Sequence, residues 1–240
     1  MSHLKQLGWA EALGAGAGQG ATGFDFFKIS VDLTKDGLAN HKKVAAIIFA
    51  YIDMLRSSGP QEWAFDEQSM LSEMSFKFLE KRKPMNYVTQ LATQMQKPYP
   101  RNWILSAPYL LTHFNADLVK GQLEGLKQEN CRITVAAQEP VDGLEWNAKE
   151  QWYGTKYRIE PFDKEILESP SSKEAHEGLH LPKPNSFIPS NLNLLNDKSK
   201  VTEPTRKPNL IRQTKISRTW HKLDDRWWVP RATVSFYIKS

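Results

Sequence analysis

The sequence predicts an α+β fold: a largely antiparallel sheet with helices packed on one face, followed by an extended linker and an isolated hairpin. Two observations predict this class. Residues 23–33 alternate apolar and polar side chains, which is typical of a strand with one side facing solvent. Three helical segments then follow one another without a strand between them, so the strict strand–helix alternation of a parallel sheet is missing.

The helical segments are predicted from apolar positions that recur every three or four residues. The first runs from a cap at Thr34 or Asp36 to a Ser-Ser-Gly-Pro stop at residues 57–60. The second begins at the proline of that stop and the third near Pro84, because proline is favoured in the first turn of a helix. The second helix is expected to turn four side chains toward the core: Trp63, Met70, Met74 and Phe78.

Shorter elements and a linker complete the chain. A helix at residues 116–125 is expected to lead into a strand at 133–137. Six prolines lie within residues 170–209 amid Ser, Asn and Lys, which indicates an extended linker because a routine loop is much shorter. Strands are predicted at residues 214–223 and 227–238, and a single hairpin of this kind is not a stable domain by itself.

Composition and charge exclude several function classes. The 240 residues carry a net charge of +5, but nine Lys or Arg and two Asp lie in residues 205–240, so the remainder sums to −2. No cluster of basic residues falls on a predicted helix face, so we expect no nucleic-acid partner. No apolar run is long enough for a membrane span and no signal peptide begins the chain, so we expect a cytoplasmic protein without membrane association. The lone cysteine, Cys131, fits a reducing compartment.

A glycine-rich run matches the G-x-G-x-x-G dinucleotide pattern at Gly18, Gly20 and Gly23. In a dinucleotide site these glycines open a helix, whose N-terminus binds the pyrophosphate. Here they precede a strand. We therefore interpret the run as a glycine-alanine turn.

Residues 176–180 read His-Glu-Gly-Leu-His, a literal H-E-x-x-H. In a zinc peptidase this motif lies on a helix, so that both imidazoles reach one zinc ion and the glutamate polarises the bound water. Gly178 and the flanking prolines disfavour a helix here. We therefore assign no metal site to the chain, and a zincin that uses His176, Glu177 and His180 is the weakest alternative.

Three motifs resemble one protein family. They are GPQEWAF at residues 59–65, EQWYGTKY at 150–157 and LPKPNSFIPSN at 181–191. Each is similar to the insulysin (insulin-degrading enzyme) branch of the inverzincin zinc metallopeptidases, which includes yeast pheromone-processing proteases. Further similarity at residues 23–34 and 220–230 falls in the same order, so the resemblance covers essentially the whole chain.

The resemblance implies a place within a larger enzyme of two halves, each made of two related α+β domains. Residues 1–197 then form an incomplete second, non-zinc domain, residues 198–230 the linker between the halves, and residues 231–240 the first strand of a truncated third domain. The family binds zinc through an H-x-x-E-H motif in its first domain. No histidine here begins that motif. We therefore expect no catalytic residue and no zinc in this chain.

One site of the family maps onto these residues. Leu13, Gly14, Ala15 and Gly16 resemble the exosite strand that holds the N-terminal end of a peptide by adding it to a sheet edge. Small side chains let a second backbone approach, and main-chain hydrogen bonds bind it with little dependence on sequence. The expected partners are unstructured peptides, the remaining peptidase domains or a homodimer partner.

Three functions thus stay open at this level. The leading one is a fragment of an insulysin-type zinc metalloendopeptidase, non-catalytic alone, that supplies part of the chamber and the exosite strand. A stand-alone peptide-binding or dimerisation module is the second. The third is an unstable remnant without function, which a cooperative thermal transition would contradict.

Overall fold

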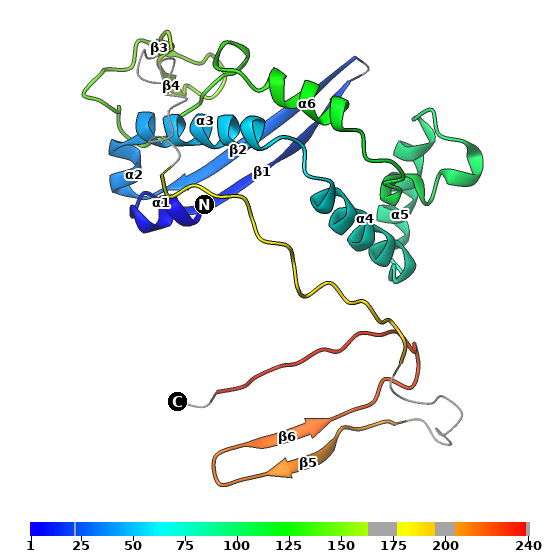
Figure 1. The fold of residues 1–240 in the computed structure, drawn as a ribbon. Helices are drawn as coiled ribbons and strands as arrows, with labels where there is room; N and C mark the ends of the chain where they lie inside the picture. The colour runs from blue at the N-terminus through cyan, green and yellow to red at the C-terminus, as the bar shows by residue number, and fades with distance from the viewer. Residues whose placement is uncertain (22, 163–176, 195–204, 239–240) are drawn as a thin grey trace. The chain divides into compact units, whose positions relative to one another are not determined.

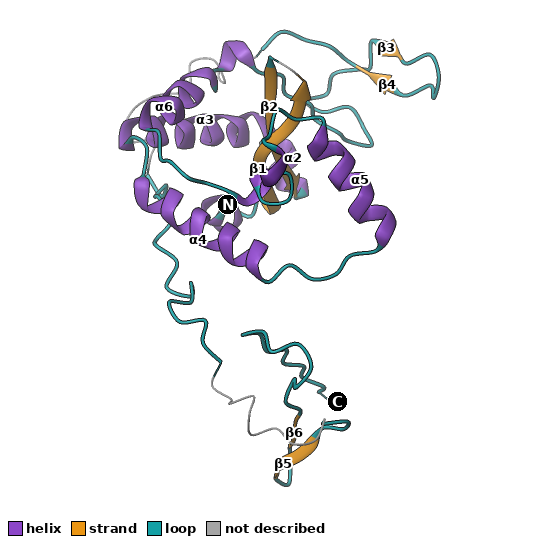
Figure 2. Ribbon diagram, turned by 90° about the vertical axis from the view of Figure 1, so that its right-hand side faces the viewer, coloured by secondary structure: helices purple, strands orange, loops and turns teal. Residues whose placement is uncertain are grey.

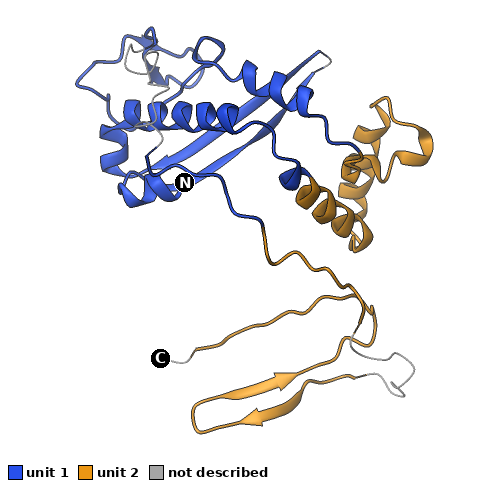
Figure 3. Cartoon of the chain, viewed as in Figure 1, with its two compact units in different colours: residues 1–65, 113–184 blue, residues 66–112, 185–240 orange. Residues whose placement is uncertain are grey.

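The structure is a computed structural model that describes residues 1–21, 23–162, 177–194 and 205–238. Helices and antiparallel strand pairs make up these residues, which confirms the α+β class (Figure 1). The chain divides into two compact units (Figure 3). Unit 1 comprises residues 1–65 and 113–184, and unit 2 comprises residues 66–112 and 185–240.

A long antiparallel hairpin organises unit 1. Strands β1 (Ala10–Ala21) and β2 (Phe24–Leu33) pair with Leu13 opposite Val31 and Ala15 opposite Ile29. The glycine-rich run lies at the tip of this hairpin: Gly18 and Gly20 are in β1 and Gly23 is in the turn with a φ of 98°. A Cβ at Gly20 would lie 1.9 Å from the carbonyl oxygen of Phe24, so this close approach requires glycine. The run opens no helix.

Two helices replace the single helix that was predicted after the hairpin. They are α2 (Lys35–Ala39) and α3 (His41–Ser58), separated at Asn40. Thr34 caps α2, because its side-chain oxygen accepts a hydrogen bond from the N–H of Gly37 at 3.0 Å. Helix α3 ends where the Ser-Ser-Gly-Pro run predicts, and Gly59 follows with a φ of 69°.

The core of unit 1 forms where α3 covers one face of the hairpin (Figure 1). Ile29, Val31 and Leu33 of β2 pack against this core, as their alternation predicts. Helix α1 (Ser2–Gln6) adds Leu4, which is 2% exposed. The buried hydrophobic residues of the described chain all lie in unit 1: Leu4, Ala10, Val44, Ala45, Phe49, Ala50 and Ile52.

Arg56 ties α3 to helix α6 (Ala116–Gly125). Its guanidinium donates to the carbonyl oxygens of Leu123 at 3.1 Å and Leu126 at 2.6 Å, and it pairs with Asp53. A cation at the C-terminal carbonyls of a helix is favourable because these groups have no partner inside the helix. A 3₁₀ turn (Gln128–Asn130) and the short hairpin of β3 (Ala148–Lys149) and β4 (Lys156–Tyr157) complete unit 1.

The described part of unit 2 contains amphipathic helices without a buried core. Helix α4 (Glu62–Lys77) begins in unit 1 and continues into unit 2, where α5 (Pro84–Met95) and two 3₁₀ turns (Arg101–Trp103 and Ala107–Tyr109) follow. No residue of α4 or α5 is buried. The expectation that Met70 faces a core was wrong, because its side chain is 49% exposed. A helical period shows which residues share a face, but not what covers that face.

The last strands differ from their prediction. The hairpin of unit 2 consists of β5 (Asn209–Gln213) and β6 (Arg218–His221), as Figure 2 shows. Its turn lies at residues 214–217, not at Asp224 and Asp225, because Thr214 accepts the N–H groups of Ile216 and Ser217 through its hydroxyl oxygen. Residues 133–137 and 227–238 are not strands either, since they lack a pairing partner among the described residues.

Candidate functional site

The four predicted exosite residues lie together on β1, at the edge of a two-stranded sheet. Strand β2 pairs with one side of β1, and no strand in the described part of the chain pairs with the other side. Leu13 is half-buried and packs against the cluster that contains Val44. Gly14, Ala15 and Gly16 are exposed. The leucine thus anchors the strand to the core while the three small residues face solvent.

Small residues continue along β1 as far as Gly18. A Cβ added at Gly14 or Gly16 would meet no atom within 4 Å, so the packing of this chain does not require glycine at either position. The face of the strand that both positions share is therefore open there. An edge with free N–H and C=O groups and almost no side-chain bulk can accept an extended peptide in register.

The histidines of the H-E-x-x-H match do not form a metal site in the described residues. His176 lies outside them. Gly178 has a φ of 78°, a value that no α-helix contains, and the His180 ring Nδ1 lies 2.9 Å from the carbonyl oxygen of Leu181. Across residues 1–21, 23–162, 177–194 and 205–238, no three His, Cys, Asp or Glu side chains gather where they could hold a metal ion. The family's zinc therefore finds no ligand set there.

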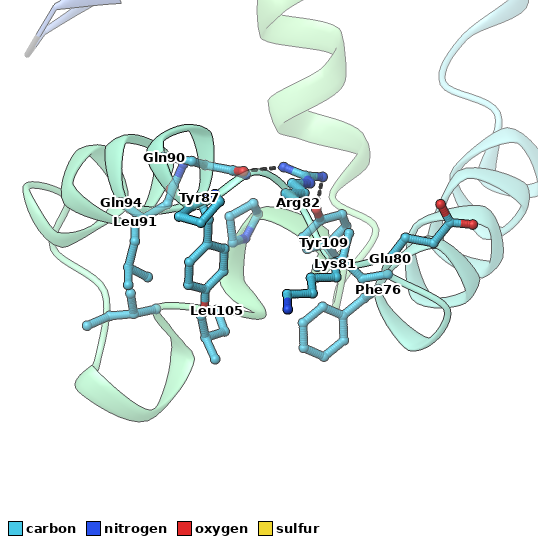
Figure 4. Close-up of a pocket in the computed structure, with 14 residues that line it drawn as sticks. Phe76, Glu80, Lys81, Arg82, Tyr87, Gln90, Leu91, Gln94, Leu105 and Tyr109 are labelled. Carbon is cyan, nitrogen blue, oxygen red and sulfur yellow. Dashed lines mark hydrogen bonds between the residues drawn. The ribbon is translucent and has the colours of Figure 1, made fainter. Parts of the chain in front are cut away.

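A cavity of about 390 Å³ lies in unit 2 between the end of α4, α5 and the 3₁₀ turns (Figure 4). Apolar side chains dominate its lining, among them Phe76, Leu91 and Leu105. At its rim the Arg82 guanidinium donates to Gln90 and, at 3.3 Å, to the hydroxyl of Tyr109. The cavity can therefore hold an apolar group next to a fixed cation.

The lining of this cavity favours binding over catalysis. It includes no Ser, Thr, Cys or His, so it lacks the hydroxyl or thiol nucleophile and the imidazole base of the common hydrolase sites. The Gln94 Oε1 atom is buried without a hydrogen-bond donor. Sequence patterns did not reveal this cavity, because they show the amphipathic face of α5 but not the turns that close around it.

None of the helices in the described ranges has the length and apolar character needed to cross a membrane.

Comparison with protein families places the whole chain within one group of peptidases. Residues 76–240 match the model of the middle or third domain of M16 peptidases. Residues 1–70 match the model of the inactive domain of M16 peptidases. The second match includes β1 and its edge.

Curated relatives are similar along the full chain. An insulin-degrading enzyme of Mus musculus is 36% identical over 240 residues, which are 100% of this chain and 23% of the relative. An insulin-degrading enzyme of Drosophila melanogaster is 39% identical over 242 residues. The A-factor-processing enzyme of Saccharomyces cerevisiae is 36% identical over 240 residues. The chain thus spans about a quarter of the length of the curated relatives it matches.

A solved structure has the same fold. The crystal structure of pitrilysin matches with a TM-score of 0.73 and 26% sequence identity, over 95% of this chain and 23% of the pitrilysin chain.

Proposed function

This chain belongs to the M16 peptidase family, and from that premise we propose that it is a non-catalytic, peptide-anchoring part of an insulysin-type zinc metalloendopeptidase. Strand β1 holds an extended peptide at its free edge through Leu13, Gly14, Ala15 and Gly16. The zinc and the hydrolytic residues belong to another domain of the family. One relative in Schizosaccharomyces pombe is named a putative zinc protease, which supports zinc as the cofactor of the complete enzyme.

The observation that carries this proposal is the open edge of β1. The exposed stretch of Gly14, Ala15 and Gly16 presents a backbone that the described residues leave unpaired on one side. The match of residues 1–70 to an inactive peptidase domain supports a binding role for the strand and not a hydrolytic one. Peptides are the substrates that fit, because an added strand is recognised through its main chain.

A titration with a fluorescently labelled, unstructured peptide tests the proposal. We expect saturable binding to the purified chain and no hydrolysis. A second peptide of the same sequence, N-methylated at every residue of its central segment, cannot donate ladder hydrogen bonds from either edge, so it is expected to bind at least about tenfold more weakly. Equal affinity of the two peptides would contradict strand addition.

Two proline variants locate the edge. In an antiparallel pair, successive residues direct their N–H groups alternately to the partner strand and away from it. One of Ala15→Pro and Gly16→Pro therefore removes an outward N–H and leaves the hairpin intact, while the other removes an inward one. The variant that retains the circular dichroism spectrum of the parent should lose peptide binding. Phe236→Ala, at an exposed residue of unit 2, is the matched control.

The same edge supports a second candidate, a stand-alone module that dimerises by pairing β1 with β1 of another copy. Sedimentation at increasing concentration distinguishes the two. A dimer that Ala15→Pro or Gly16→Pro abolishes, without any peptide binding, favours the module.

A cytoplasmic location is a further part of our proposal, and fractionation of cells tests it. The name of one Arabidopsis thaliana relative states a peroxisomal location for that protein, and a peroxisomal location of this chain would contradict our proposal.

A further inference from the structure

The β3–β4 hairpin of unit 1 carries two aromatic residues at its tip. Trp152 is 82% exposed and Tyr153 is 93% exposed. In Figure 2 this hairpin stands off from the helices of unit 1. Scattered apolar residues are normal on a protein surface, but two adjacent large rings in solvent mark a contact site.

The tip is held rigidly, although nothing in the described chain packs over it. The two carboxylate oxygens of Glu150 accept the backbone N–H groups of Trp152 and Tyr153, each at 2.6 Å. Across the turn, the Glu150 N–H donates to the carbonyl oxygen of Thr155 at 2.8 Å. Gly154 closes the turn with a φ of 69°. A preorganised aromatic pair loses little conformational entropy when a partner covers it.

The strands below the tip place two lysines side by side. Lys149 lies directly opposite Lys156 in the ladder, and like charges in this position destabilise a strand pair. Neither ammonium group forms a salt bridge with a carboxylate among the described residues. The neighbouring Glu150 directs both of its oxygens to the N–H groups of the turn. A partner with carboxylates at this position would remove the repulsion.

A shallow depression of about 540 Å³ at the base of the hairpin extends this surface. Trp146, Glu145 and both lysines line it. The hairpin therefore offers an exposed aromatic tip, two lysines below it and a recess that can accept a side chain. Trp and Tyr are also the residues that most often dominate the binding free energy of protein interfaces.

We propose that this hairpin is a docking anchor, whose Trp152 and Tyr153 insert into an apolar socket rimmed by carboxylates on another domain of the M16 peptidase, whichever chain carries that domain. The relatives supply the reason for this partner, since the matched region is only 23% of their length. The inference rests on the family membership that underlies the proposed function. It requires no peptide binding at β1.

A chimera tests the anchor directly. This chain replaces the aligned segment of the Drosophila melanogaster relative, and hydroxyl-radical footprinting follows side-chain oxidation. We expect Trp152 and Tyr153 to oxidise about tenfold more slowly in the chimera than in the isolated chain, in proportion to the exposure that is lost. Phe49 is the folding control, because it is buried in both contexts. Equal oxidation of the tip in the two contexts would overturn the proposal.

Binding in trans gives a second measurement. The chain is mixed with the two flanking pieces of the same relative, and the affinity is measured by interferometry. The W152A/Y153A variant should bind about 30-fold more weakly. K149E/K156E should also bind more weakly, and its salt dependence should reverse, because added salt then screens a repulsion between carboxylates. Phe187→Ala, at a residue that is 91% exposed in unit 2, should change the affinity by less than about twofold.

Three outcomes would count against the anchor. The first is that the flanking pieces do not bind the unsubstituted chain. The second is that the W152A/Y153A variant binds as tightly as the parent. The third is that the tip of the isolated chain becomes protected at high concentration, which assigns the surface to a second copy. Peptide titration of W152A/Y153A keeps this test separate from the proposed function, because the β1 edge should bind peptide unchanged in that variant.

Discussion

Unit 1 and unit 2 are built from similar amphipathic helices, but among the residues that the structure describes only those of unit 1 bury a core. Helix α3 of unit 1 contributes five buried residues, whereas α5 of unit 2 contributes none. On α5, Met85 is 76% exposed and Met95 is 64% exposed. The difference is the partner surface: α3 lies on the β1–β2 hairpin, and no sheet in the described residues of unit 2 covers α5. Helical periodicity produces an apolar face, and stability follows only where another element covers it.

The largest loss of stability is expected from a substitution in the core of unit 1. Phe49→Ala should lower the free energy of unfolding by about 3–5 kcal/mol, because it leaves a cavity in a cluster where this ring is 7% exposed. Urea denaturation followed by circular dichroism measures the change. Met95→Ala on α5 is the matched control and should change stability by less than about 0.5 kcal/mol. Comparable losses in both variants would remove the contrast between the units.

A smaller loss of stability is expected at the N-terminal end of α2, and the N-terminal end of α5 provides the comparison. Thr34→Ala should cost about 1 kcal/mol, because the α2 cap at Gly37 is lost together with the hydrogen bond from the Thr34 hydroxyl to the carbonyl oxygen of Gly8. Thr34→Ser should retain most of the stability. Lys83 stands at the corresponding position of α5 and makes no side-chain cap, so Lys83→Ala should be neutral in the same thermal unfolding measurement.

The smallest effect is local and depends on pH. Backbone hydrogen bonds from Trp152 and then Tyr153 hold the pKa of Glu150 below its ordinary value. A depressed pKa in the folded state means that the stabilisation is present above the ordinary glutamate range and is lost as the pH falls through the lower, folded value. The amide resonances of Trp152 and Tyr153 should therefore stay constant from neutral pH through the ordinary glutamate range and shift only below that range. In Glu150→Gln this titration should disappear; a shift that persists in the variant would assign it to another group.

Local signals predicted the helices well. Pro84 marked the start of α5, Gly59 followed the end of α3, and Thr34 was one of two candidates for the cap that α2 uses. Each of these signals acts within one turn of helix, so the neighbouring residues suffice to read it. The alternation in β2 likewise identified the face that meets α3.

Tertiary partners were harder to predict. Residues 133–137 alternate as a strand does, but a strand also needs an edge to pair with, and sequence alternation does not supply one. The turn at Thr214 depends on a single hydroxyl that satisfies two N–H groups, which is a weaker signal than the neighbouring Asp pair. The domain limits at residues 197 and 230 stay predictions.

The candidate site was predictable only in part. The small residues from Gly14 to Gly16, read with the family resemblance, predicted an exosite strand. Strand β1 pairs with β2 alone among the described residues, and its role as an exosite stays a prediction. The cavity beside Gln94 and the rigid hairpin tip at Trp152 were not found, because each depends on contacts between residues whose arrangement only the fold defines.

Hydrogen exchange of the whole chain, measured by mass spectrometry with and without a saturating unstructured peptide, tests the central claim most directly. The account predicts slow exchange in α3, fast exchange in α5, and new protection of β1 on peptide addition, with α5 unchanged. Protection of α5 equal to that of α3 in the free chain would contradict the contrast between the units. Unchanged exchange in β1 with peptide bound would contradict the assignment of its edge as the anchoring site.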